Sequence, residues 1–255
     1  MELAIFLLTG SLLLIMSLTI TPGLNFVQAQ GTDLYTFPVN SSPYGILFKD
    51  WVAKWSAWQN TIPKSQNWNF QNAPGVKYVP EDCSYLQNPA SPVFFLPYVG
   101  AERGAVATMT CNVPHNKAMF INIDGATSDY SDPTVKTKTA AELIRLVTKS
   151  NIYPNSFDIT LDGHPLAFTN DEAYKVQTDL FNLTLPADNL WGEPRGPDLA
   201  ITQGWWVMLK PLPPGQHTVH YITGYRDSKS DPTIPPGQGN EAPYIQDVTY
   251  HLIVK

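Results

Sequence analysis

The stretch FDITLDGHPLAF, residues 157–168, decides the fold class of this 255-residue chain. Two runs rich in β-branched and aromatic residues, 157–161 and 164–168, flank the dipeptide Asp162-Gly163. Because both positions of this dipeptide tolerate a positive φ angle, it is a strong short-range indication of a β-hairpin. The stretch therefore predicts two antiparallel strands joined by a tight turn.

Similar short apolar runs, separated by proline and glycine, occur along most of the chain; they are residues 93–96, 105–112, 118–123, 204–210, 217–223 and 248–254. We expect the fourth and fifth of these runs to form a second hairpin around Pro211–Gly215. Twenty-three prolines, 16 glycines and only 15% charged residues disfavour long helices. The pattern predicts an all-β fold, an antiparallel β-sandwich of the jelly-roll or immunoglobulin-like type.

Two segments have helical spacing instead. In residues 42–60, four apolar side chains recur on one helical stripe: Leu47, Trp51, Trp55 and Trp58. Ser42 followed by Pro43 predicts the start of this helix, because a hydroxyl can accept a free amide there. In residues 139–149, Thr139 and Glu142 match a capping box. We expect two short helices that lie against a sheet.

The beginning of the chain predicts export. Residues 3–20 are almost wholly apolar, and Val27-Gln28-Ala29 matches a signal-peptidase site. We expect a signal peptide over residues 1–29 and a single sandwich domain over residues 30–255, secreted or held at the cell surface without a membrane segment. The alternative is an uncleaved signal anchor, since the only early charge is Glu2 and the apolar run is about 20 residues long.

Export has chemical consequences for the rest of the chain. Cys83 and Cys111 are the only cysteines, so an oxidising compartment predicts a disulfide between them. Asn40 and Asn182 begin acceptor triplets for N-glycosylation. The alternative for Cys111 is a copper site, because His115 and Met119 follow it on one loop. That site would need a second histidine, and His115 is the first in the chain.

Charge and motif content exclude several functions. The formal net charge is −6 without a basic cluster, which argues against nucleic acid as a partner. No nucleophile elbow, zincin helix or phosphate loop occurs, and no cofactor is predicted. Asp124, Asp129 and Asp132 supply carboxylates within nine residues, which makes them weak candidates for calcium. The alternative is a solvated turn that leads into the second helix.

Tryptophans supply the remaining candidate site. Trp191, Trp205 and Trp206 could stack against sugar rings if they face water. Trp205 and Trp206 are adjacent, so on a half-buried strand at most one is core and the other could be exposed. The Ser-, Pro- and Gly-rich stretch 227–243 predicts a long loop, a second candidate for ligand contacts.

The order of local patterns resembles a widespread family of uncharacterised exported prokaryotic proteins. The patterns are the Trp-rich segment with Trp51, Trp55 and Trp58; Cys83, Gln87 and residues 93–97; Cys111 through Phe120; Leu161-Asp-Gly163; Asn189-Leu-Trp-Gly192; the Pro-Leu-Pro-Pro-Gly-x-His turn, 211–217; and the closing Asp-Val-Thr-Tyr strand, 247–250. The resemblance implies a secreted single domain and supports the cysteine pairing, and it implies no activity. Relatives tend to have Asp-Gly-Tyr-Trp where this chain has Gln203-Gly-Trp-Trp206.

These observations predict a secreted or cell-surface, non-catalytic protein that binds a glycan or a cell-surface protein. The first alternative is an extracellular polymer-degrading hydrolase that uses acids such as Asp124, Asp129 and Asp132. The second is a structural surface or matrix component that assembles through strand edges.

Overall fold

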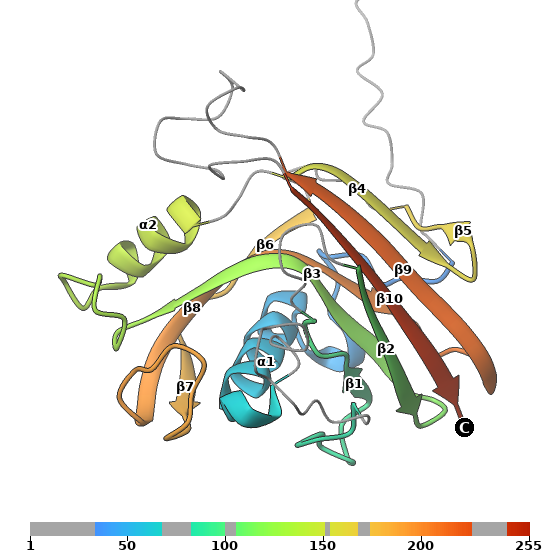
Figure 1. Cartoon of the computed structure of the whole chain (residues 1–255), viewed down its shortest axis with the longest axis horizontal. Coiled ribbons are helices and arrows are strands. Elements are labelled where there is room, and N and C mark those ends of the chain that lie inside the picture. Colours follow the sequence, from blue (N-terminus) through green and yellow to red (C-terminus); the bar gives the residue numbers. More distant parts are fainter. Residues whose placement is uncertain (1–33, 68–82, 100–105, 151–153, 168–173, 226–243) are drawn as a thin grey trace, which may run out of the picture. The chain divides into compact units, whose positions relative to one another are not determined.

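The computed structural model describes residues 34–67, 83–99, 106–150, 154–167, 174–225 and 244–255, and within these ranges ten strands form two sheets (Figure 1). The first sheet has the order β1 (Val93–Phe95), β3 (Ala118–Asp129), β8 (Gly196–Leu209) and β6 (Lys175–Gln177), and β7 (Phe181–Leu185) also pairs with β8. The second sheet has the order β2 (Val106–Val113), β10 (Tyr244–Val254), β9 (Gly215–Tyr225), β4 (Pro154–Leu161) and β5 (His164–Pro165). The predicted mostly-β, two-sheet class is confirmed.

Both predicted helices are present. Helix α1 covers Phe48–Thr61 and α2 covers Ala140–Ser150. Helix α2 begins as predicted, because Thr139 Oγ1 accepts the amide of Glu142 at 3.3 Å. The predicted start of α1 is wrong: Ser42 makes no capping bond, and Pro43–Gly45 is a separate 3₁₀ turn that ends with a left-handed glycine, φ 77°.

The hairpin at Asp162-Gly163 is confirmed, with φ of 52° and 77° at the two turn residues and Leu161 paired to His164. The second predicted hairpin is wrong. Strand β8 belongs to the first sheet and β9 to the second, so residues 210–214 carry the chain from one sheet to the other. Pro211, Pro213 and Pro214 have no amide hydrogen to give to a hairpin ladder, which suits a connection between sheets.

Most strand pairs are antiparallel, and two are parallel. Strand β1 pairs with β3 in parallel, because the intervening β2 lies in the other sheet and the chain returns in the same direction. Strand β10 pairs in parallel with β2 over eight positions, from Asp247–Val106 to Val254–Val113. The prediction of a wholly antiparallel arrangement is wrong for these two pairs.

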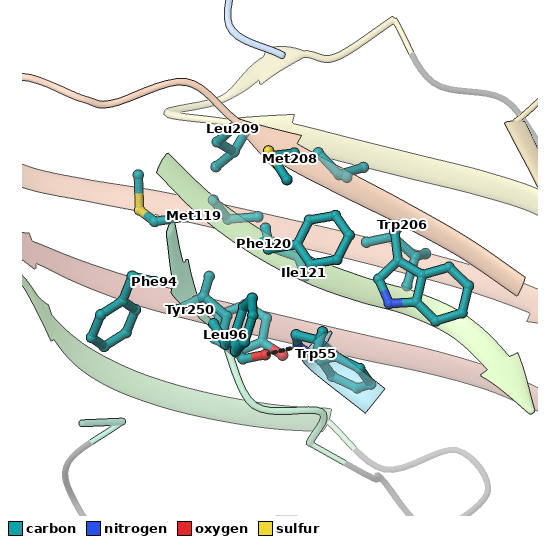
Figure 2. Packing of buried hydrophobic residues seen from close by; sticks show 14 of the residues in the cluster. Trp55, Phe94, Leu96, Met119, Phe120, Ile121, Trp206, Met208, Leu209 and Tyr250 are labelled. Atoms are coloured by element: carbon teal, nitrogen blue, oxygen red, sulfur yellow. Dashed lines mark hydrogen bonds between the residues drawn. The ribbon is translucent and has the colours of Figure 1, made fainter. Parts of the chain in front are cut away.

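Both faces of β8 are covered. Trp206 packs against Trp55 of α1 at a ring distance of 6.3 Å, and Trp205 packs against Phe157 of β4 at 5.6 Å. Because successive residues of a strand point to opposite faces, α1 covers one face of the first sheet and the second sheet covers the other. Figure 2 shows part of this core, where Trp55 of α1, Phe120 and Trp206 lie among side chains from β1, β3 and β10.

The cysteines form the predicted disulfide, Cys83–Cys111, which ties the segment before β1 to strand β2. The sulfur of Cys111 is therefore part of a disulfide and is not a copper ligand, so the copper interpretation is wrong. Within the described ranges, no helix is long and apolar enough to cross a bilayer. The predicted signal peptide and the predicted loop at 227–243 lie outside the described residues.

Candidate functional site

The structure separates the three predicted ligand-binding tryptophans. Trp205 and Trp206 are 2% and 1% exposed, so the expectation that one of them faces water is wrong. The reason is that β8 is covered on both faces, whereas the prediction assumed a half-buried strand. Trp191 is 59% exposed and is the one of the three that presents its ring to solvent.

Trp191 is nevertheless held in place. Its indole Nε1 donates to Asn60 Oδ1 at 3.1 Å, and the Asn60 amide donates to the carbonyl of Ser56 within α1 at 2.8 Å. Asn60 is buried, so its side chain is itself fixed. The exposed ring is therefore attached by its polar edge to the last turn of α1, and its faces stay free to pack against a ligand.

The backbone around Trp191 is organised by one buried side chain, Asn189. Its Oδ1 accepts the amides of Trp191 at 3.1 Å and Glu193 at 3.0 Å, while its Nδ2 donates to the carbonyls of Pro186 and Glu193. Gly192 has a left-handed φ of 71°, which allows the chain to turn directly after the tryptophan. One amide group thus fixes both Trp191 and the position of Glu193.

Asp188 fastens the same segment to the residues that follow α1. Its carbonyl accepts the amide of Lys64 at 2.6 Å, and its Oδ2 accepts the amide of Ser65 at 3.1 Å. Together with the Trp191–Asn60 bond, these contacts join residues 186–193 to the C-terminal end of α1. We call this surface the Trp191 platform: Asn60, Asp188, Asn189, Trp191 and Glu193.

A carboxyl cluster adjoins the platform through Glu193. Asp129 lies at the end of β3 and Asp198 at the start of β8. The Asp129 carboxyl interacts with those of Asp198 and Glu193, and we call these three residues the acid cluster. Asp129 is only 4% exposed, and its Oδ1 accepts the amides of Ser131 and Asp132 at 2.8 and 3.1 Å.

Two members of the acid cluster, Asp129 and Glu193, have raised pKa values. Burial raises the pKa of Asp129 to about 6, and the negative charge of Asp198 acts in the same direction. Burial, with the charges of Asp129 and Asp132, raises the pKa of Glu193 to about 7. Among the described residues, no donor reaches the buried Oε2 of Glu193 or Oδ2 of Asp198. Protonation supplies the missing donors, because a carboxylic acid can donate to a neighbouring carboxylate.

The predicted calcium ligands do not gather at one place. Asp124 lies within β3, five extended positions or about 16 Å from Asp129 along the strand. Asp132 uses its Oδ1 to accept the amide and hydroxyl of Thr134, both at 2.7 Å. Within the described ranges, no three His, Cys, Asp or Glu side chains are arranged to hold a metal ion.

Glu193 and Asp198 were missed by the sequence analysis. They lie 64 and 69 positions after Asp129, and what brings them to it is the pairing of β3 with β8, in which Asp129 stands opposite Ala200. The clue in the sequence was Asn189-Leu-Trp-Gly192, which was noted as part of the family resemblance but not as a turn. The glycosylation candidates Asn40 and Asn182 are both exposed.

No family model matches this chain, and no curated protein matches it. Two solved structures are similar to it over part of its length. One is the cysteine protease inhibitor EhICP2 from Entamoeba histolytica, at 14% identity and a TM-score of 0.18, covering 59% of this chain and 94% of that one. The other is PbICP-C, solved in complex with falcipain-2, at 13% identity and a TM-score of 0.20, covering 65% of this chain and all of that one. Likeness at this level carries no argument about activity.

Proposed function

We propose that this chain is an exported, non-catalytic β-sandwich protein that binds a glycan on the Trp191 platform, with the acid cluster beside it supplying hydrogen-bond acceptors. The observation that carries the proposal is the attachment of an exposed tryptophan ring to a buried asparagine. Ordering a side chain on binding costs free energy, so a ring that is already ordered in the free protein binds more tightly.

The chemistry of the surroundings favours a sugar. A tryptophan face packs against the apolar face of a sugar ring, while hydroxyl groups need acceptors close by. Glu193, which is partly exposed and lies two residues after Trp191, is placed to accept such a hydrogen bond. The net charge of −6 disfavours polyanionic glycans, so the proposed ligand is a neutral or cationic oligosaccharide.

The proposal also includes export, N-glycosylation and a single sandwich domain. The Cys83–Cys111 disulfide supports maturation outside the reducing cytosol. The exposed Asn40 and Asn182 support glycosylation where the producing cell has that machinery. The two-sheet arrangement supports a jelly-roll or immunoglobulin-like sandwich as one domain over residues 30–255, in line with the exported family that the sequence resembles.

A glycan array with purified protein tests the proposal. We expect Trp191→Ala to lower the affinity for the bound glycan at least tenfold, and Trp191→Phe to keep most of it because an aromatic face remains. Trp205→Phe serves as a buried control that leaves binding unchanged. Absence of any bound glycan, or unchanged binding by Trp191→Ala, would contradict the proposal; binding of a protein partner instead would show up in a pull-down that depends on Trp191.

The raised pKa of Glu193 favours a hydrolase as a second candidate, because a general acid works best with a pKa close to the working pH. Against it, the Asp129 and Glu193 carboxyls are close enough to raise the pKa of Glu193, whereas the paired carboxyls of glycosidases stand about 5 Å or more apart. A hydrolase would release soluble sugars from a polysaccharide panel and would lose turnover in Glu193→Gln. Binding of a glycan without turnover would favour the non-catalytic binding protein over the hydrolase.

A further inference from the structure

A second concave site lies along α1, on a different face of the helix from Asn60, which holds Trp191. It is a pocket of about 360 Å³ between α1 and the segment that leads into β1. Three side chains of α1 line it, Trp51, Lys54 and Trp58, which recur at helical spacing and so face the same way. Its volume falls in the range of small-molecule sites, about 300–1,000 Å³.

The walls of this pocket are aromatic and fixed. Trp51 Nε1 donates to the Pro43 carbonyl at 3.0 Å, and Trp58 Nε1 donates to the Tyr85 carbonyl at 3.1 Å. Phe95 of β1 packs against both indoles, with ring distances of 6.3 and 5.6 Å. The indole hydrogens are thus already bonded to the protein, and the surface left for a ligand is apolar.

The polar side chains of the rim are also largely committed. Gln87 donates to the carbonyls of Cys83 and Phe95 and accepts the Phe95 amide. Ser91 donates to the Val93 carbonyl and accepts the Val93 amide. These bonds hold the rim in shape, and they leave little hydrogen-bonding capacity for a ligand.

Lys54 differs from the other polar groups of the pocket. It is exposed, and none of the ion pairs among the described residues includes it. No lining residue of the described pocket carries a carboxylate. A second ammonium group, Lys117 Nζ, donates to the carbonyls of Asn88 and Pro89 at 3.4 and 2.8 Å, on the turn that forms the rim. The pocket is therefore locally cationic on a chain with a net charge of −6.

From this charge and shape we propose that the pocket binds a small organic carboxylate with a flat apolar body. The body packs against the parts of Trp51, Trp58 and Phe95 that line the pocket, and the carboxylate pairs with the ammonium of Lys54. The site is separate from the Trp191 platform and needs no glycan. An aromatic carboxylate satisfies both the apolar walls and the single unpaired charge.

Isothermal titration with 2-naphthoate, and with its neutral analogue 2-naphthamide, tests this proposal on the purified protein. We expect naphthoate to bind one equivalent and more tightly than the amide. Lys54→Gln weakens naphthoate about fivefold, the size of a partly exposed ion pair, and leaves the amide unchanged. Lys49→Gln is the matched control: this lysine lies on the same helix, pairs with Asp179 at 2.7 Å and does not line the pocket.

Indole N–H resonances in NMR spectra locate the bound probe. Shifts at Trp51 and Trp58, with Trp191 unmoved, support the pocket. Equal affinity for the acid and the amide, equal loss of both in Lys54→Gln, or no shift at Trp51 and Trp58 overturns the proposal. Shifts confined to Trp191 overturn it as well and leave glycan binding at the platform standing, so the two proposals fail independently.

Discussion

Trp191 and Asn60 are 131 positions apart in the chain, and their side chains meet in a hydrogen bond of 3.1 Å from the indole Nε1 to the amide Oδ1. The bond spans the boundary between the exposed platform and the buried end of α1. Asn60→Ala, which also removes the bond to the Ser56 carbonyl, is expected to lower the free energy of unfolding by about 2 kcal/mol, the net value of two hydrogen bonds.

The same substitution is expected to weaken glycan binding severalfold, because the indole gains freedom that binding must then remove. Urea unfolding gives the first quantity and titration with the array ligand the second. Asn182→Ala, an exposed asparagine on β7, is the control. Full binding by Asn60→Ala would show that the anchoring of the ring is irrelevant to affinity.

The imidazole of His217 lies between two acceptors, Asp162 Oδ2 at 2.7 Å and the Pro213 carbonyl at 3.0 Å. Burial opposes the charged imidazole, but the bonds to Asp162 and Pro213 outweigh it and raise the pKa of His217. Burial likewise opposes the charge of Asp162, and its bonds from His217 and the Thr218 amide outweigh it and lower the pKa of Asp162.

The pair therefore contributes most between about pH 4 and 6.5, the unfolded pKa values of the two groups. Its contribution is lost as pH rises through the raised pKa of His217, and as pH falls through the lowered pKa of Asp162. Since both groups are partly exposed, we expect no more than about 1 kcal/mol. The difference between the unfolding free energies of the wild type and His217→Gln, measured from pH 3 to 9, should be bell-shaped; a flat difference would contradict the pairing.

Asp129 and Glu193 of the acid cluster lower the stability of the folded protein at neutral pH. In the folded protein the pKa values of Asp129 and Glu193 are about 6 and 7, whereas in the unfolded chain both carboxyls titrate near pH 4. Between about pH 4 and 7 the folded protein therefore binds more protons than the unfolded chain, and its stability falls as the pH rises. We expect Glu193→Gln to reduce this slope and to raise stability at pH 8 by about 1 kcal/mol after allowance for solvent screening. Thermal unfolding at pH 5 and pH 8 checks both; an unchanged slope would rule out Glu193 as the titrating group.

Gly204 is the point of closest approach between β8 and β3. A Cβ atom at this position would overlap the Asp124 carbonyl and the Cα of Gly125. We expect Gly204→Ala to cost about 3 kcal/mol or more, the upper range for overpacking. Gly215→Ala is the matched control: Gly215 has a similar φ of 150°, but the nearest atom to a Cβ at this position is Nε2 of His217, at 3.8 Å. Similar losses for the two variants would assign the effect to backbone strain alone.

The disulfide closes a loop with a sequence separation of 28. By loop entropy, its removal in Cys83→Ser/Cys111→Ser is expected to lower the free energy of unfolding by about 3–4 kcal/mol. Denaturant unfolding of the double variant beside the oxidised wild type measures the loss. Equal stability of the two proteins would mean that the unfolded chain is already constrained in this region.

Local patterns predicted the parts of the fold that depend on neighbours in the chain. The turn at Asp162-Gly163, the cap at Thr139 and three of the four residues of the predicted stripe, the tryptophans of α1, follow from spacings of a few residues and are present. The fourth, Leu47, is wrong, because it precedes the helix and is 50% exposed. The start of α1 was misjudged because Tyr44 adopts a left-handed φ of 57°, which bulky residues rarely do.

Long-range pairing was the part that the sequence did not reveal. Hairpin signals say which strands are adjacent in the chain, and they cannot show that β8 and β9 belong to different sheets. The continuous apolar run Trp205–Leu209 did carry a usable indication, since a strand covered on both faces loses its alternation. Read in that way, it would have predicted two buried tryptophans and left Trp191 as the exposed one.

Strand β10 lies between β2 and β9, although it follows every other strand in chain order. Because β10 pairs with both β2 and β9, the second sheet cannot be completed until residues 244–254 have been synthesised. A chain that ended between Tyr225 and Tyr244 would leave the edges of β2 and β9 without their partner strand and open to aggregation.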